Sequence, residues 1–140
     1  MVNQYQKWAT CYFGYFNIFF PVLSQPHFMR QLSEQTVDPL LLYAVCAIGA
    51  KYSENDQETS TFYYERCQCI LNMSRDPITL STVQALVILC WYSYLLGNMQ
   101  TCCDLRHRLL QSANDLQLCR DPGSSLGIVD IEMRRRAFWV

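Results

Sequence analysis

Apolar residues recur at intervals of three and four along most of the chain, which is the pattern of amphipathic helices. The pattern is clearest after Asp38-Pro39, where the recurring positions are Leu40, Leu41, Ala44, Val45 and Ile48. Asp38 can accept hydrogen bonds from the free backbone N–H groups of a first turn, and Pro39 loses no hydrogen bond at the first helical position. The small residues Ala47, Gly49 and Ala50 permit close contact with another helix. This segment therefore predicts a helix that packs tightly against a neighbour.

A second long helix is predicted after Thr79, which can cap its first turn. Its wide apolar stripe consists of Leu80, Val83, Leu86, Val87, Cys90, Trp91 and Tyr94. Gly97-Asn98 ends this helix, because glycine readily adopts the left-handed conformation that closes helices. Another helix is expected from about Met99 to Leu118. Its apolar seam consists of Leu105, Leu109, Ala113 and Leu116.

Less regular patterns predict the remaining helices. Their expected ranges are Tyr5 to Phe20, 26–33 and 59–73, followed by a final helix that begins near Asp130. Pro21 and Pro26 break the first of these, and no strand-type alternation competes anywhere. The sequence thus predicts one all-α domain over residues 1–140, an irregular bundle of about six or seven helices. We expect the C-terminal part of this domain to lie beyond Val140.

Composition narrows the function classes. Charged residues make up 16% of the chain, against roughly one quarter in an ordinary soluble domain, and aromatic residues make up 14%. A chain with so few charged and so many aromatic residues is expected to have a surface that another molecule or segment partly covers. The net charge of −1 lacks the positive balance of nucleic-acid-binding domains, so these residues are not expected to bind DNA themselves. The apolar runs 11–23 and 80–96 are too short or too interrupted to span a membrane, and no membrane contact is expected.

Eight cysteines first suggest a disulfide framework, but their positions favour free thiols. Cys46, Cys69 and Cys90 lie in apolar helical patterns, as buried free cysteines do. Cys67 and Cys69 form no C-x-x-C motif and have no second pair at ligand spacing, so no metal site is predicted. We therefore expect structural or inert thiols in a reducing, intracellular setting. No metal or other cofactor is expected in this chain.

Few side chains suggest catalysis. Cys103 and His107 lie four residues apart on one predicted helix face, where a thiol–imidazole pair can act as a nucleophile or bind metal, but no third ligand or orienting carboxylate accompanies them. His27 is expected to be a partly buried structural histidine. The arginines at 134–136 are expected to pair with carboxylates such as Glu132 rather than with nucleic acid. Motifs for a nucleophile elbow, a zinc protease or a phosphate loop are missing, so no catalytic, cofactor-binding or metal-binding residue is assigned.

Four segments carry a recognisable order of motifs. They are D-P-L-L-L-Y-A-V-C-A-I-G-A-K-Y-S at 38–53, T-L-S-T-V-Q-A-L-V-I-L at 79–89, A-N-D-L-Q-L-C-R-D at 113–121 and E-M-R-R-R-A-F-W at 132–139. They resemble the regulatory, or middle homology, domain of fungal zinc-cluster transcription factors of the xylanolytic-activator kind. Residues 16–28 resemble its opening motif more loosely. The chain departs from the pattern at Gln117 (usually Gly), Cys119 (usually His), Cys103 (usually Trp) and His107 (usually small). We expect Cys103 and His107 to change the packing of their helix, and Gln117 to change how that helix ends.

The resemblance implies regulation rather than catalysis. A complete factor would be nuclear, would bind DNA through a separate six-cysteine binuclear zinc cluster that these residues lack, and would regulate transcription by RNA polymerase II. The domain itself would act through other segments of the factor, protein partners or a small-molecule effector. Two alternatives are a helical interaction scaffold unrelated to transcription and an enzyme fragment that uses Cys103 and His107. A cavity lined by aromatics of the 80–96 helix would favour an effector, and a flat exposed apolar face would favour a scaffold.

Overall fold

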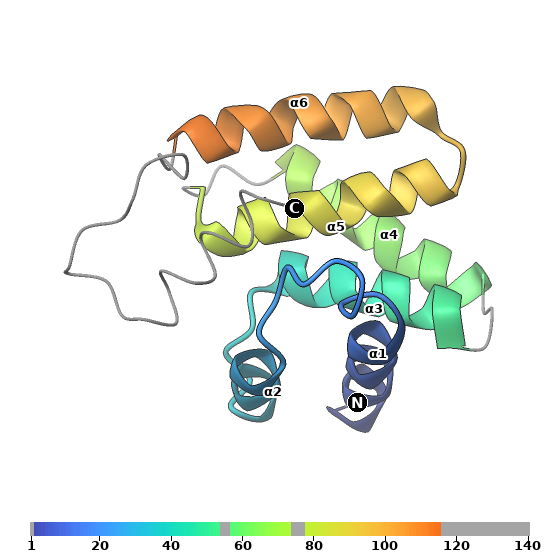
Figure 1. Cartoon of the computed structure of the whole chain (residues 1–140), viewed down its shortest axis with the longest axis vertical. Helices are drawn as coiled ribbons and strands as arrows, with labels where there is room; N and C mark the ends of the chain where they lie inside the picture. Colours follow the sequence, from blue (N-terminus) through green and yellow to red (C-terminus); the bar gives the residue numbers. More distant parts are fainter. Residues whose placement is uncertain (1, 54–56, 74–77, 116–140) are drawn as a thin grey trace.

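The computed structural model describes residues 2–53, 57–73 and 78–115, and these residues form α-helices and no strand (Figure 1). The helices are α1 (Val2–Tyr15), α2 (Gln25–Ser33), α3 (Pro39–Ser53), α4 (Gln57–Met73), α5 (Leu80–Leu95) and α6 (Met99–Asp115). The predicted all-α, multi-helix bundle is therefore confirmed. The predicted extension of α6 to Leu118 and the final helix near Asp130 lie outside the described residues. Among the described helices, none combines the length and the apolar content needed to cross a lipid bilayer.

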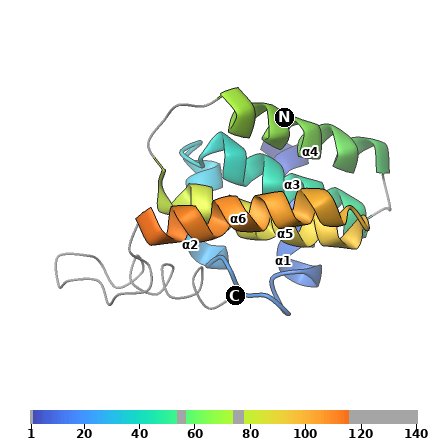
Figure 2. The ribbon, with the colours of Figure 1, turned by 90° about the horizontal axis from the view of Figure 1, so that it is seen from above.

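The central helix of the bundle is α3. It contacts α1, α4 and α5, while α6 packs against α5. Figure 1 shows α3 between the α5–α6 pair on one side and α1 and α2 on the other, and Figure 2 shows α4 alongside α3. The buried residues of α3 are Leu40, Leu41 and every residue from 44 to 50. A helix that is apolar on all sides is stable only when other helices surround it, which explains its place in the bundle.

The backbones of α1 and α3 touch beside Gly49. A Cβ atom at this position would overlap the carbonyl oxygen of Trp8 and would lie 2.8 Å from the carbonyl carbon of the same residue. Ala47 and Ala50, which lie near it on α3, are fully buried. The prediction that small residues of this helix permit close contact is confirmed, and only glycine fits at the point where the two backbones meet.

A buried polar network joins α4 to α3 and α5. The Ser60 hydroxyl donates to the carbonyl oxygen of Ala47 at 2.7 Å. A serine hydroxyl has a single proton, so the Tyr92 hydroxyl, 2.7 Å away, must donate to Ser60. A second pair of hydroxyls, on Tyr64 and Ser93, lies 2.8 Å apart. Because hydrogen bonds are directional, these contacts fix the rotation of α4 about its own axis.

The predicted helix boundaries at α3 and α5 are confirmed by their caps. The Leu40 N–H donates to Asp38 Oδ1 at 3.0 Å, one residue after Pro39 begins α3. Thr79 caps α5 through a reciprocal capping box with Thr82. Gly97 follows α5 with a φ of 77°, the left-handed conformation expected of a glycine that ends a helix.

The predicted first helix, Tyr5 to Phe20, is wrong at its C-terminal end, because α1 stops at Tyr15. Asn17 closes the turn that follows. Its Nδ2 donates to the carbonyl oxygen of Leu23 at 3.1 Å, and its Oδ1 accepts from the N–H of Leu23 at 3.2 Å. These bonds offer the backbone an alternative to continuing the helix. They also hold Leu23 in the core, where its side chain is 1% exposed.

The prediction that Cys69 is buried is also wrong, because this thiol is exposed. The buried stripe of α4 consists instead of Ser60, Tyr63, Cys67 and Leu71. Cys69 follows Cys67 by two residues and so lies on another side of the helix. Cys46 is buried as predicted, Cys90 is half-buried, and the seven cysteines of the described part are all free thiols.

The contact at Gly49 predicts a large effect from one added methyl group. Gly49→Ala is expected to lower the free energy of unfolding by about 1–3 kcal/mol, because the methyl group meets the Trp8 backbone. The loss is expected even though alanine favours a helix over glycine by ~1 kcal/mol. Gly14→Ala on α1 is the matched control, since no described atom lies within 4 Å of a Cβ there. Urea denaturation followed by circular dichroism measures both, and equal stability of the two variants would argue against the backbone contact.

The direction of the hydrogen bonds in the buried network predicts that substitutions of Ser60 and Tyr92 lower the free energy of unfolding by unequal amounts. Ser60→Ala is expected to lower the free energy of unfolding by about 1–3 kcal/mol, because it removes the shared partner of the Tyr92 hydroxyl and the Ala47 carbonyl. Tyr92→Phe is expected to cost less, about 0.5–1.5 kcal/mol, because Ser60 keeps its bond to Ala47. The two losses are expected to be non-additive in the double variant. A larger cost for Tyr92→Phe than for Ser60→Ala would contradict this order.

Candidate functional site

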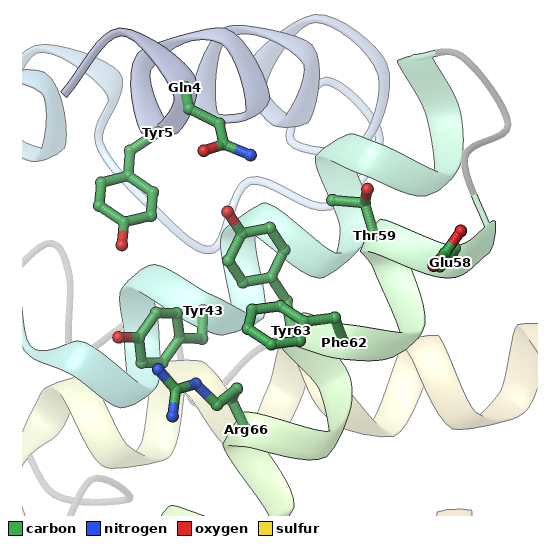
Figure 3. Close-up of a pocket in the computed structure, with 8 residues that line it drawn as sticks. All are labelled: Gln4, Tyr5, Tyr43, Glu58, Thr59, Phe62, Tyr63 and Arg66. Atoms are coloured by element: carbon green, nitrogen blue, oxygen red, sulfur yellow. The ribbon is translucent and has the colours of Figure 1, made fainter. Parts of the chain in front are cut away.

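A pocket of about 370 Å³ lies between α1, α3 and α4 (Figure 3). Its wall is largely aromatic and carries charged groups of both signs. The lining residues are Gln4 and Tyr5 of α1, Tyr43 of α3, and Glu58, Thr59, Phe62, Tyr63 and Arg66 of α4. Small-molecule pockets in proteins typically measure about 300–1,000 Å³, so this pocket has the size for a small organic ligand.

Tyr63 lies at the centre of the aromatic wall. Its ring stacks on that of Tyr43 with the centroids 5.9 Å apart, and the ring of Phe62 approaches it edge-on at 5.4 Å. The ring of Tyr5 completes the group at 6.4 Å. Tyr63 belongs to the buried stripe of α4 and is 4% exposed, whereas its neighbour Phe62 is 52% exposed. The wall therefore has a rigid centre in the core and an accessible edge.

Arg66 brings a positive charge to this pocket. Its guanidinium carbon lies 5.6 Å from the centre of the Tyr43 ring and 5.4 Å from that of Phe62, which are cation–π distances. Within the described ranges, no carboxylate pairs with this guanidinium. Glu58 lies eight residues earlier on α4, about 12 Å along the helix at a rise of 1.5 Å per residue. Figure 3 shows the two charged side chains at opposite ends of the group.

The phenol groups of Tyr5 and Tyr63 hold their protons at neutral pH. Burial is the main cause that raises the pKa of Tyr63 to about 12, with a smaller contribution from Cys46. Burial also raises the pKa of Tyr5, followed by the effect of Tyr43, and the positive charge of Arg66 opposes this shift. Protonated phenols can donate hydrogen bonds, so the pocket holds hydrogen-bond donors as well as a cation.

The residues singled out from the sequence do not lie at this pocket. Cys103 and His107 are exposed on α6, and they line neither this pocket nor two smaller ones of about 190 and 240 Å³. His27 is half-buried, as predicted, and lines the 190 Å³ pocket beside Gln84. In the part of the chain that the structure describes, no three His, Cys, Asp or Glu side chains gather as metal ligands. The arginines at 134–136 and Cys119 lie outside that part.

The aromatic residues of α5 line none of these three pockets. The ring of Trp91 instead packs on Phe20 with the centroids 4.3 Å apart, and it meets Tyr94 edge-on at 5.8 Å. This contact joins the turn after α1 to the end of α5. Five apolar side chains close in sequence to this contact are exposed, and we call them the apolar patch: Ile18, Phe19, Tyr94, Leu95 and Leu96.

The pocket was not predicted from the sequence, because its walls come from three distant segments. Tyr5, Tyr43 and the residues of α4 meet only when α1, α3 and α4 pack together. The one local indication is the spacing of Phe62 and Arg66, which places an aromatic ring and a cation on one face of a helix. Such a pair is common on helix surfaces and does not indicate a pocket by itself.

Comparison with known proteins links the chain to transcriptional regulators. Two Schizosaccharomyces pombe proteins described as uncharacterized transcriptional regulatory proteins are 28% and 27% identical over 71% and 92% of the chain. The TY1 enhancer activator of Saccharomyces cerevisiae is 28% identical over 71% of the chain. The chain spans 17%, 15% and 15% of the lengths of these three relatives, and no solved structure matches it. The family described as "Fungal specific transcription factor domain" matches residues 9–140, as the sequence motifs predicted, and the chain belongs to this family.

Proposed function

We infer that the chain is a regulatory domain of a nuclear transcription factor and modulates transcription by RNA polymerase II. The family match over residues 9–140 carries this inference, and relatives described as transcriptional regulators support it. The net charge of −1 fits a domain that acts on DNA only through another part of a longer factor, such as the zinc cluster typical of the family. Its role is then to control the activity of that factor rather than to bind its target sequence.

Regulation of this kind needs a surface that responds to another molecule. The pocket between α1, α3 and α4 supports a small-molecule effector, because it combines an aromatic wall with an unpaired cation. The apolar patch supports contact with protein, either another segment of the factor or a separate partner, because large apolar side chains such as Phe19 are 74% exposed there. The relatives are several times longer than the region they share with this chain, so segments of the same polypeptide can supply that contact.

We propose no catalytic role for the domain. Cys103 and His107, the pair with the most catalytic character, are exposed on α6, and among the described residues no carboxylate forms an ion pair with the imidazole. The apolar patch also favours a second function, a helical scaffold for protein assembly that is unrelated to transcription. The two functions differ in one property, which is whether the domain alters transcription when it is tethered to DNA.

This difference predicts the result of a reporter experiment. The chain is placed between a heterologous DNA-binding domain and an activation domain, and reporter output in a fungal nucleus is compared with that of a fusion that carries a flexible linker. The domain is expected to change the output several-fold. Leu41→Asp, which charges a side chain that is 3% exposed in the core, is expected to abolish the change. Leu110→Asp, at a side chain that is 61% exposed, is expected to retain it.

Immunoblotting checks that the fusions are present in comparable amounts. Equal output from the domain and the linker fusions would favour the scaffold. An identical change with the Leu41→Asp variant would show that the folded domain is not responsible for the effect.

A further inference from the structure

We propose that the pocket between α1, α3 and α4 binds a small aromatic carboxylate, with the carboxylate at Arg66 and the ring against Tyr5, Tyr43 and Tyr63. This inference names the class of effector and rests on the proposed regulatory function for its biological meaning. The binding itself depends only on the pocket. Its volume of about 370 Å³ lies at the small end of the usual range for ligand pockets, which suits one ring with short substituents.

The charge at Arg66 selects an anionic group. A guanidinium presents a planar fork of N–H donors that matches the two oxygens of a carboxylate. Arg66 is exposed and has no carboxylate partner among the described residues, so this fork is open to a ligand. The rings of Tyr43 and Phe62 lie within 5.6 Å of the guanidinium carbon and hold it beside the pocket.

The aromatic wall selects a flat ligand. Three tyrosine rings line the pocket and pack against one another, with the centroids of Tyr5 and Tyr43 lying 6.4 and 5.9 Å from that of Tyr63. An anion without a ring, such as acetate, would leave the accessible parts of the Tyr5, Tyr43 and Phe62 rings uncovered. A ring against them gains apolar burial as well as offset or edge-on aromatic contacts.

A cationic ligand fits less well, although groups of aromatic rings often bind ammonium ions. The cation of Arg66 already lies against two of the rings, Tyr43 and Phe62, and would repel a second positive charge. The phenol hydroxyls of Tyr5 and Tyr63 retain their protons at neutral pH and can donate to an anion. The Arg66 cation and the phenol donors therefore both favour a negatively charged ligand.

Glu58 defines the opposite end of the ligand. Its carboxylate lies at the far end of the group from Arg66 (Figure 3). A second carboxylate on the ligand would meet a like charge there, whereas a hydroxyl group could donate to Glu58. The pocket is thus expected to prefer an aromatic monocarboxylate with a hydroxyl at its opposite end over a dicarboxylate.

The test is isothermal titration calorimetry at neutral pH, in which para-hydroxybenzoate is titrated into the purified 140-residue chain. We expect saturable binding that weakens at least about tenfold in Arg66→Gln, because the charge-assisted bonds to the ligand are lost. The uncharged analogue para-hydroxybenzamide is expected to bind the native chain more weakly than para-hydroxybenzoate by a similar factor. Arg30→Gln, which removes an exposed arginine from α2, is the matched control and is expected to leave the affinity unchanged. Terephthalate is expected to bind more weakly than para-hydroxybenzoate.

Three results would overturn the proposal. They are the absence of saturation at millimolar para-hydroxybenzoate, equal affinity for the acid and the amide, and an unchanged affinity in Arg66→Gln. Circular dichroism checks that this surface variant is folded. The titration contains no DNA and no reporter, so failure of the proposed regulatory function and failure of this binding site give separate results.

Discussion

The backbone contact between α1 and α3 at Gly49 is the constraint on which the rest of the arrangement depends. Because no side chain separates Gly49 from Trp8, α1 packs directly on the central helix. Tyr5 lies one turn before Trp8 on the same helix, so this contact also determines how close Tyr5 comes to Tyr43 and Tyr63. A methyl group at Gly49 would move α1 outward and open the pocket on the side of α1. Core packing and the candidate site are thus two consequences of one close approach.

The position of α4 depends on a different kind of interaction. Its buried stripe is narrow and includes two polar side chains, Ser60 and Tyr63, so apolar burial alone specifies its rotation weakly. The hydrogen bonds from Ser60 to the Ala47 carbonyl and from Tyr92 to Ser60 supply the missing direction. Once Ser60 and Tyr63 face the core, the helical period places Arg66 at the rim of the pocket, where its charge stays in contact with water.

Features that depend on neighbouring residues were predictable from the sequence, and features that depend on distant contacts were not. Asp38-Pro39, Thr79 and Gly97 act within a single turn of the chain, so the start of α3 and both ends of α5 follow from local chemistry. The end of α1 depends on bonds between Asn17 and Leu23 across a turn that has no periodic pattern. The pocket needs three helices to meet, and the sequence contains the order of their residues but not the distances between them.

The pocket and the apolar patch are joined by α1 and the turn that follows it. Tyr5 near its beginning lines the pocket, and the turn after its end carries Ile18 and Phe19 of the patch. A ligand changes a distant contact only if it binds one arrangement of the protein more tightly than another. Here the two arrangements would have to differ in the position of α1, because α1 lines the pocket and leads into the turn that carries Ile18 and Phe19. A small rotation of α1 about the Gly49 contact would move Tyr5 and the turn that carries Ile18 and Phe19 together.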